Sequence, residues 1–290
     1  MMSRAKPNVY VLMAVYNGEP WLPEQIQSVL HQEDVTVRLF ISVDMSTDGS
    51  FAYCMRMSEE NLEVEVLGYG EHFGSATRNF SRLIAEVDTL DADFVAFCDQ
   101  DDIWDSDKLI RSIKALSERG CSAVSSDVTA FWEDGRKRLI VKSQPQRKLD
   151  YVLEAAGPGS TYVLTQSAWS AHKSWLSERL TYELPPHDWL IYAFCRIYGY
   201  SWFILSESTV LYRQHEGNFL GANLGFRGRL ARIESIRSGE FQKDVFRLKH
   251  LFGDDFPIST TRFGLLKHWS QLRRKRSEAV IFALLCLVFW

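Results

Sequence analysis

The sequence predicts an α/β fold with a mostly parallel central sheet, flanked by helices and followed by a helical C-terminal extension. Short runs of apolar, β-branched and aromatic residues alternate with segments of helical periodicity through the first two-thirds of the chain. Polar residues follow several of these runs, and ligands bind beyond the carboxyl ends of strands in such sheets. The sequence therefore also predicts where a site lies.

Each predicted element follows from a local pattern. Strands are predicted where mainly apolar residues follow one another, at residues 8–16, 37–44, 62–67, 93–98, 122–131, 160–165 and 201–212. Helices are predicted where apolar residues recur at helical spacing, at residues 19–32, 46–59, 75–87, 105–119 and 185–198, and over most of the chain from residue 226. Gly120 stands where a C-cap glycine would end one of these helices. Residues 145–158 are expected to hold a loop and a junction.

The composition excludes several classes of protein. The chain has 290 residues, of which 46% are hydrophobic and only 17 are glycine, so collagen-like and disordered proteins are excluded. Its five cysteines are spread out with no CxxC, which argues against a disulfide framework or a cysteine zinc site and favours a reducing cytosol. Residues 1–8 lack the apolar run of a signal peptide.

Charge is divided unevenly along the chain. Residues 1–212 carry a formal charge of −11 and residues 213–290 carry +7, so the acidic part does not resemble a nucleic-acid binder. Four basic residues at 273–276 precede twelve apolar residues at 279–290. That run is too short to span a bilayer but suits a lipid interface beside basic residues. The alternative is a C-terminal helix packed on the body of the protein or on a partner.

An acidic motif follows the strand at 93–98. Asp99, Asp101 and Asp102 place three carboxylates within four residues, and their repulsion favours a bound cation. Mg²⁺ and Mn²⁺ prefer such oxygen ligands, and Mg²⁺ commonly adds substrate phosphates to one or two carboxylates. The motif therefore suits a metal–diphosphate site. A solvated acidic turn, or an N-cap for the next helix, is the alternative.

Three further segments carry candidate functional groups. Asp44 ends a strand, where its carboxylate could accept from the N–H of a base. Asp188 opens the helix at 185–198 beside His187 and suits a general base, with a helix cap as the alternative. Arg213 suits phosphate binding, and His215 suits a metal or a phosphate unless it is a structural histidine.

Other catalytic motifs are absent from the sequence. It contains no GxSxG, P-loop, HExxH or GxGxxG pattern. The glycine-rich residues 157–161 lack the lysine of a P-loop and are expected to shape a pocket.

Taken in order, the motifs resemble those of the family 2 glycosyltransferases with a GT-A fold. The form of the motifs is nearest to the bacterial rhamnosyltransferase-like branch, and the resemblance covers about residues 8–220. The motifs are YNG (16–18), SVDMSTDGS (42–50), TRNF (77–80), DQDDIW (99–104), HDW (187–189) and YRQH (212–215). One departure is that Val43 and Met45 replace an acid and a glycine of the usual second motif.

The resemblance implies a role for each matching residue. The nucleotide-sugar donor would contact Ala14, Val15, Tyr16, Asp44, Arg78, Asp99, Gln100 and Arg213. A Mg²⁺ or Mn²⁺ ion would be held by Asp101, Asp99 and His215, and Asp188 would be the catalytic base. The acceptor would meet Gly159, Ser160, Thr161, His187 and Trp189.

The resemblance also implies an organisation and partners. A Rossmann-like GT-A domain over residues 1–220 would comprise a donor-binding half (1–121) and an acceptor and catalytic half (122–220), followed by a basic membrane-associating region (221–290). An inverting transfer of a sugar is implied, with rhamnose from dTDP-rhamnose as best guess and UDP-linked donors open. The acceptor would be a glycan or lipid-linked glycan of a cell-surface polysaccharide such as O-antigen.

The implied address is cytoplasmic, peripheral on the inner face of the cell membrane, through an anionic lipid surface, and no nucleic-acid partner is expected. A non-catalytic carbohydrate- or lipid-binding protein of the same fold is the alternative. A sugar nucleotidyltransferase is a further one, although the glycine-rich run with Arg and Lys expected there is replaced by Asn17-Gly18-Glu19. A phosphatase with an Asp nucleophile would carry its acidic motif after the first strand.

Overall fold

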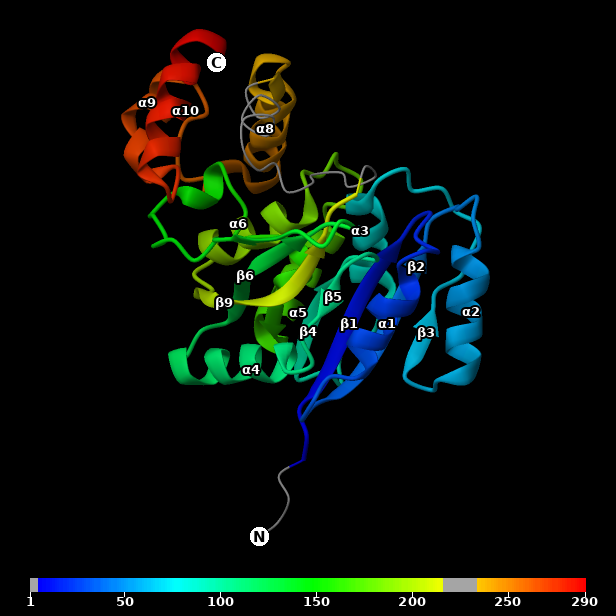
Figure 1. Cartoon of the computed structure of the whole chain (residues 1–290). Helices are drawn as coiled ribbons and strands as arrows, with labels where there is room; N and C mark the ends of the chain where they lie inside the picture. Colours follow the sequence, from blue (N-terminus) through cyan, green and yellow to red (C-terminus); the bar gives the residue numbers. More distant parts are fainter. Residues whose placement is uncertain (1–4, 216–233) are drawn as a thin grey trace.

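The computed structural model describes residues 5–215 and 234–290, which form a nine-stranded sheet with helices on both faces (Figure 1). The strands are β1 (Asn8–Val15), β2 (Thr36–Val43), β3 (Val64–Val66), β4 (Phe94–Cys98), β5 (Ile103–Trp104), β6 (Ala123–Phe131), β7 (Lys137–Ile140), β8 (Val163–Thr165) and β9 (Trp202–Arg213). The helices are α1 (Leu22–Leu30), α2 (Ser50–Glu60), α3 (Ala76–Glu86), α4 (Lys108–Arg119), α5 (Gln166–Ser177), α6 (His187–Ile197), α8 (Glu240–Phe252), α9 (Arg262–Lys267) and α10 (Arg276–Phe289).

The strands are ordered β3-β2-β1-β4-β8-β6-β9-β5, and β7 pairs with β6. β3, β2, β1 and β4 are parallel, as expected for strands joined by helical crossovers. β8 runs antiparallel between β4 and β6, whereas β6 and β9 are parallel. The predicted α/β fold is confirmed, and the antiparallel strands of its second half complete the sheet around the carboxyl ends of β4 and β9.

The core fills both faces of the sheet because side chains alternate along each strand. On β1, Tyr10 and Leu12 face the layer that contains α3, α5 and α6. Val11 and Met13 face the layer of α1, α2 and α4. α4 ends at Gly120, whose φ of 57° is the left-handed conformation predicted for its C-cap.

Several elements differ from the prediction. The helix α5 was not predicted because its serines and its single lysine lie among few apolar residues, and burial of Trp169 and Leu176 stabilises it instead. β5 and β7 were also not predicted. β5 is two residues long and forms by pairing with β9, while three of the four residues of β7 are exposed and it forms by pairing with β6. The strand predicted at 160–165 begins with a 3₁₀ turn, Gly159–Thr161.

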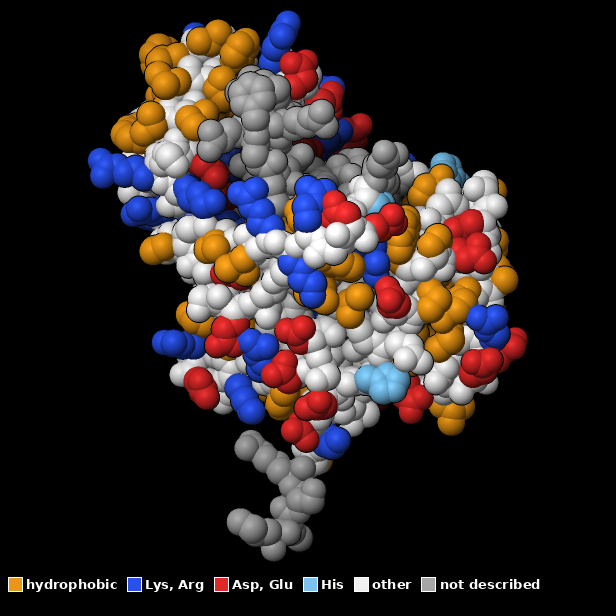
Figure 2. Space-filling view, viewed as in Figure 1, with side chains coloured by type: hydrophobic (Ala, Val, Ile, Leu, Met, Phe, Trp, Pro, Cys, Tyr) orange, Lys and Arg blue, Asp and Glu red, His pale blue; other side chains and the backbone are white. Residues whose placement is uncertain are grey.

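The C-terminal helices α8, α9 and α10 lie together beyond α6, at the top of Figure 1. α10 buries Ala279, Phe282 and Cys286, at positions i, i+3 and i+7. Phe282 and Cys286 belong to the same core as residues of β1 and α6. Its other face is apolar and open, with Leu284 61% and Val288 67% exposed. Figure 2 shows hydrophobic side chains gathered over this end of the molecule, with basic side chains beside them.

The basic run at 273–276 is only partly on the surface. Arg274 is buried and paired with Asp150 and Glu154, whereas Lys275 and Arg276 are exposed. Among the described residues no helix has both the length and the apolar character needed to cross a bilayer. The predicted boundary between residues 220 and 221 and the predicted start of helix at 226 lie outside the described residues. The five cysteines, all described, are free thiols.

Candidate active site

The acidic motif occupies the connection between β4 and β5. Asp101 and Asp102 are buried, while Asp99 is partly exposed. Burial raises the pKa of Asp99 to about 7, and the negative charges of Asp101 and Asp188 add to the rise. Burial also raises the pKa of Asp102 well above its usual value, again with help from its acidic neighbours. The motif therefore concentrates carboxylates where water cannot fully solvate their charge.

The carboxyl end of β9 brings a guanidinium and an imidazole to this motif. Nε of Arg213 donates to the carbonyl oxygen of Asp101 (2.8 Å), and the Arg213 amide donates to Oδ1 of Asp102 (3.1 Å). Nε2 of His215 lies 2.8 Å from Oδ2 of Asp101, and its ring stacks on Trp21 at 3.9 Å. A second carboxylate, Glu24 of α1, pairs with Nη2 of Arg213 (2.5 Å). The structure therefore brings together Asp101, Arg213 and His215, which the resemblance assigned to one site.

Asp188 reaches the same site from the first turn of α6. It is not the N-cap, because Pro186 holds that position. Burial raises the pKa of Asp188 to about 6, while a hydrogen bond from the Trp189 amide (2.7 Å) and the charge of Lys142 act in the opposite direction. A carboxylate with a pKa near neutrality beside Asp99 has the properties of a general base.

The carboxyl end of β1 is fixed to the acidic motif by Gln100. The Tyr16 amide donates to Oε1 of Gln100 (2.7 Å), and Nε2 of Gln100 donates to the Tyr16 carbonyl (2.9 Å). A Cβ on Gly18 would lie 2.5 Å from Oε1 of Gln100, so a larger residue there would displace the Gln100 amide. The amide of Gln100 thus holds the backbone of the predicted base pocket, while the ring of Tyr16 stays half exposed.

Asp44, at the end of β2, organises the loop before α3. Its carboxylate accepts from the amides of Phe73 (2.8 Å) and Gly74 (2.9 Å) and lies 3.2 Å from Nδ1 of His72. The Asp44 amide donates to the carbonyl of Val15 (2.8 Å), which joins the ends of β1 and β2. Asp44 therefore lies beside the predicted base pocket, with its oxygens bonded to the 72–74 loop.

The two departures from the family pattern fit this geometry. Val43 is buried as the last residue of β2, as the sequence predicted. Met45 is half exposed, and its φ is not positive, so the turn does not need glycine there. Asn79, from the TRNF motif, donates to the carbonyls of Val15 (3.2 Å) and Ser42 (3.0 Å) and so clamps the ends of β1 and β2.

The glycine-rich turn packs against the start of α6. A Cβ on Gly159 would lie 2.5 Å from Nε2 of His187, so the two segments are in tight contact. The His187 ring stacks on Phe80 at 4.0 Å, and burial lowers the pKa of His187 to about 3. Ser160 and Thr161 are buried in the same turn. The neutral His187 ring thus packs against Gly159 and Phe80 and supports the neighbouring Asp188.

Two of the predicted site residues lie apart from this cluster. Trp189 is buried, donates from Nε1 to the Tyr151 carbonyl (2.7 Å) and stacks on Phe241. It therefore supports α6 through contacts outside the cluster. Arg78 is exposed in the first turn of α3. Ala14 is partly buried on β1, opposite Ser42.

Sequence reasoning missed three residues that shape the site. Lys142 lies beside Asp188, and Glu24 pairs with Arg213. Lys108 is fully buried behind the acidic motif, with Nζ 3.5 Å from the centroid of the Trp104 ring, and burial lowers its pKa to about 7. Lys142 follows β7, which was itself not predicted. Lys108 and Glu24 lie on predicted helices, where nothing in the sequence pattern distinguishes them from surface residues.

The donor set fits a divalent cation that is bound together with a diphosphate. In residues 5–215 and 234–290 no group of three or more His, Cys, Asp or Glu side chains is arranged to enclose a metal. Asp101 and His215, which face each other, and the nearby Asp99 supply carboxylate and imidazole ligands. Mg²⁺ commonly takes only one or two protein carboxylates and completes its coordination with phosphates and water.

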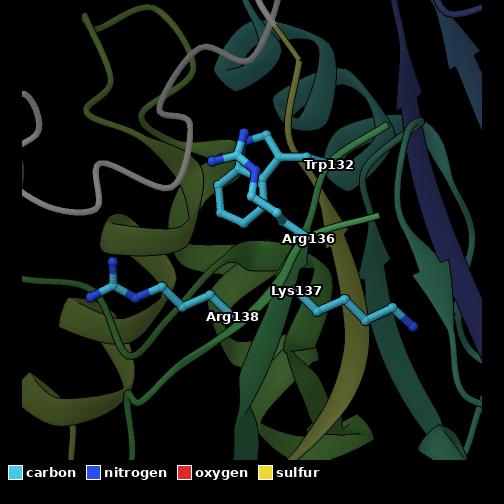
Figure 3. A pocket seen from close by; sticks show the side chains of 4 residues that line it. All are labelled: Trp132, Arg136, Lys137 and Arg138. Atoms are coloured by element: carbon cyan, nitrogen blue, oxygen red, sulfur yellow. The ribbon is translucent and has the colours of Figure 1, made fainter. Parts of the chain in front are cut away.

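A separate basic pocket of about 390 Å³ lies on the β6–β7 hairpin (Figure 3). It is lined by Trp132, Arg136, Lys137 and Arg138. The Arg136 guanidinium lies over the Trp132 ring and pairs with Asp134, so its charge is already partnered. The lining of this pocket includes none of the residues that the sequence predicted for the site.

The central sheet with helices on both faces and the acidic motif after β4 have the arrangement that the resemblance implies for a GT-A glycosyltransferase. The model of the family described as "Glycosyl transferase family 2" matches residues 10–180, more than half of the chain. The chain belongs to this family.

Curated relatives agree with this assignment. The chain is 36% identical to a protein named dTDP-rhamnosyl transferase RfbG of Shigella flexneri, over 95% of this chain and 99% of that protein. It is 28% identical to the putative teichuronic acid biosynthesis glycosyltransferase TuaG of Bacillus subtilis, over 46% of this chain and 52% of that protein.

Solved structures share the fold. The S. aureus TarS 1–349 complex with UDP-GlcNAc aligns with a TM-score of 0.56 at 13% identity, covering 97% of this chain and 71% of that one. The mannosyltransferase PcManGT from Pyrobaculum calidifontis, in complex with GDP-Man and Mn²⁺, aligns with a TM-score of 0.54 at 15% identity, covering all of this chain and 82% of that one.

Proposed function

We propose that this glycosyltransferase moves a sugar from a nucleotide diphosphate to an acceptor hydroxyl in a single displacement that inverts the anomeric carbon. The observation that carries the proposal is the Asp188 carboxyl, whose pKa is raised to about 6, beside Asp99 at the strand ends. A base of this pKa is largely ionised at neutral pH and can take a proton from the attacking hydroxyl.

The donor diphosphate would lie between the acidic motif and the end of β9. Asp101, Asp99 and His215 would hold Mg²⁺ or Mn²⁺, which supplies positive charge against the leaving diphosphate when bound. Arg213 stands at the same place and adds a fixed cation, supported by its bonds to Asp101 and Asp102. The nucleoside would lie along Ala14, Val15, Tyr16 and Asp44, with Arg78 at the rim.

We infer dTDP-rhamnose as the donor because the full-length relative is named a dTDP-rhamnosyl transferase. UDP-linked donors are the second candidate, since a structural neighbour binds UDP-GlcNAc. The acceptor would be a glycan or a lipid-linked glycan of a cell-surface polysaccharide, approaching Asp188 along the turn of Gly159, Ser160 and Thr161. No nucleic-acid partner is proposed.

We further propose that residues 221–290 hold the catalytic part, residues 1–220, on the inner face of the cell membrane. Support comes from the open face of α10, where Leu284, Leu287 and Val288 are more than half exposed beside the exposed Lys275 and Arg276. Phe263 of α9 is 83% exposed and extends the same apolar end. Apolar side chains flanked by basic ones bind anionic lipid interfaces.

Transfer of labelled rhamnose from dTDP-rhamnose to a detergent-dispersed lipid extract of bacterial membranes tests the reaction. Asp188→Asn should bind the donor as the native protein does and lose roughly 10²–10⁴-fold in turnover. Asp254→Asn, a change of an exposed acid remote from the site, is the matched control. Turnover in Asp188→Asn comparable with that of the control would contradict Asp188 as the base.

Sedimentation with anionic vesicles tests the membrane proposal. The double variant Leu284→Ser, Val288→Ser should lose vesicle binding and keep the thermal stability of the native protein. Leu62→Ser, at a 98% exposed leucine remote from α10, is the matched control. Full vesicle binding by the double variant would contradict the proposed surface.

A further inference from the structure

A buried carboxylate outside the site lies at the junction of α6 and the C-terminal segment. Asp150, in the 3₁₀ turn Asp150–Val152, has no exposed surface. Its oxygens accept from Oη of Tyr192 (3.0 and 3.1 Å) and from Nη1 of Arg196 (2.9 Å). A buried charge requires partners of good geometry. Asp150 therefore fixes the position of the helix that supplies them.

The two partners of Asp150 lie on the face of α6 that carries the proposed base. Asp188, Tyr192 and Arg196 are spaced by four residues, and positions i, i+4 and i+8 share one face of a helix. Asp188 is in the first turn of α6, and the two partners follow in the next turns. The bonds to Asp150 thus fix the rotation of α6 about its own axis and its position along that axis. The position of the Asp188 carboxyl follows from both.

The C-terminal segment adds a second cation to this junction. Arg274 is 3% exposed, with Nη1 3.5 Å from Oδ2 of Asp150 and Nη2 3.4 Å from Oε2 of Glu154. Its amide donates to Oε1 of Glu154 (2.6 Å), and Nη2 donates to the carbonyl of Ala155 (2.7 Å). Arg274 therefore joins Asp150 to the chain that leads into the Gly159–Thr161 turn.

We propose that Arg274 is a positioning residue for the transfer reaction, through which the C-terminal segment holds Asp188 at the reacting centre. The inference rests on the proposed role of Asp188 as the base. Arg274 acts on α6 through Asp150 and on the glycine-rich turn through the backbone at 154–155. It also stands two residues before α10, so the surface proposed to meet lipid and the base are connected through one side chain.

Removal of the Arg274 guanidinium leaves the fold supported. Asp150 keeps Tyr192 and Arg196 as partners, so its charge is not left alone in the core. What is lost is the restraint on α6 and on the 154–155 backbone, and a displacement of about 1 Å at a reacting group can cost about 10²-fold in rate. The hydrogen-bond and ion-pair partners of Arg274 are Asp150, Glu154 and Ala155, which lie outside the proposed donor site at the ends of β1, β2, β4 and β9. Donor affinity should therefore not change.

The test compares Arg274→Gln with Arg274→Lys and with Arg119→Gln, a matched change of an exposed arginine at the end of α4. Calorimetry gives the Kd for dTDP-rhamnose, and transfer to the detergent-dispersed lipid extract gives kcat and KM. Arg274→Gln should lower kcat at least about tenfold and leave the donor Kd and KM within about twofold. Arg274→Lys should recover part of kcat, and Arg119→Gln should match the native protein.

Native kcat in Arg274→Gln would overturn the proposal, as would a parallel loss of donor affinity and kcat. If Arg274→Gln does not fold, Glu154→Gln is the second variant, because it weakens the interaction of residue 154 with Arg274 while Asp150 keeps its partners. Native kcat in Glu154→Gln would also overturn the proposal. Asp188→Asn is measured alongside. If Asp188→Asn still transfers the sugar, Asp188 is not the base and the positioning role of Arg274 is refuted with it. If Asp188→Asn is inactive but Arg274→Gln has native kcat, only the positioning role of Arg274 is refuted.

Discussion

Lowering the pH through 6 should switch off transfer by protonating Asp188. Burial raises the pKa of this carboxyl to about 6. The ionised form is the active base, so activity is present above this pKa and is lost as the pH falls through it. Asp188→Asn should remove the pH step because the amide does not titrate in this range.

The size of the step follows from the pKa. A group with a pKa of about 6 is roughly nine-tenths ionised at pH 7 and roughly one-tenth ionised at pH 5, so kcat/KM should fall about tenfold between them. Asp99, with a pKa raised to about 7, titrates in the same range. A saturating divalent cation favours the ionised form of Asp99, so Asp99 then titrates at a lower pH than Asp188.

The assay is transfer from dTDP-rhamnose at saturating Mn²⁺ between pH 5 and pH 8, with initial rates at low donor concentration. Asp254→Asn should reproduce the native profile. A native rate that does not change between pH 5 and pH 7 would refute the reasoning. So would a residual rate in Asp188→Asn that keeps the native midpoint, because another group would then be titrating.

Three further changes test the geometry around the site. Gly159→Ala places a Cβ 2.5 Å from Nε2 of His187, so transfer should fall about tenfold while calorimetric donor affinity stays native. Asp44→Ala leaves the amides of the 73–74 loop without an acceptor, at about 1–3 kcal/mol each, and should weaken donor binding and lower Tm. Phe282→Ala should cost about 3–5 kcal/mol in urea unfolding, whereas a loss below 1 kcal/mol would contradict packing of α10 on the body.

The first half of the fold could be predicted because each of its elements has a strong local pattern. β1 and β2 are mainly apolar, and Gly120 ends α4 in the conformation that glycine favours. α5, β5 and β7 could not be predicted since their sequences are weak in local propensity. They form because partners distant in the sequence bury or pair with them.

The candidate site could be predicted in its parts but not in its internal bonding. Carboxyl ends of parallel strands meet at one edge of a sheet, so Asp44 and Asp99 were expected near each other, and the family resemblance added Arg213 to them. The sequence did not indicate that Gln100 clamps the Tyr16 backbone or that His187 packs as a neutral ring against Gly159. Nor did it separate Arg274, which is buried, from its exposed neighbours in the basic run. Side-chain partners of this kind depend on distances across the fold.

Donor binding tests the central claim most directly. Calorimetry would compare dTDP-rhamnose, UDP-galactose, UDP-glucose and UDP-GlcNAc, with and without Mn²⁺, for the native chain, for Asp101→Ala and for Asp134→Ala as an exposed control. We expect one nucleotide sugar to bind in a metal-dependent manner, with binding lost in Asp101→Ala and retained in Asp134→Ala. Folded native protein that binds none of these donors, or an Asp101→Ala variant that binds as tightly as the native chain, would contradict the proposed donor site.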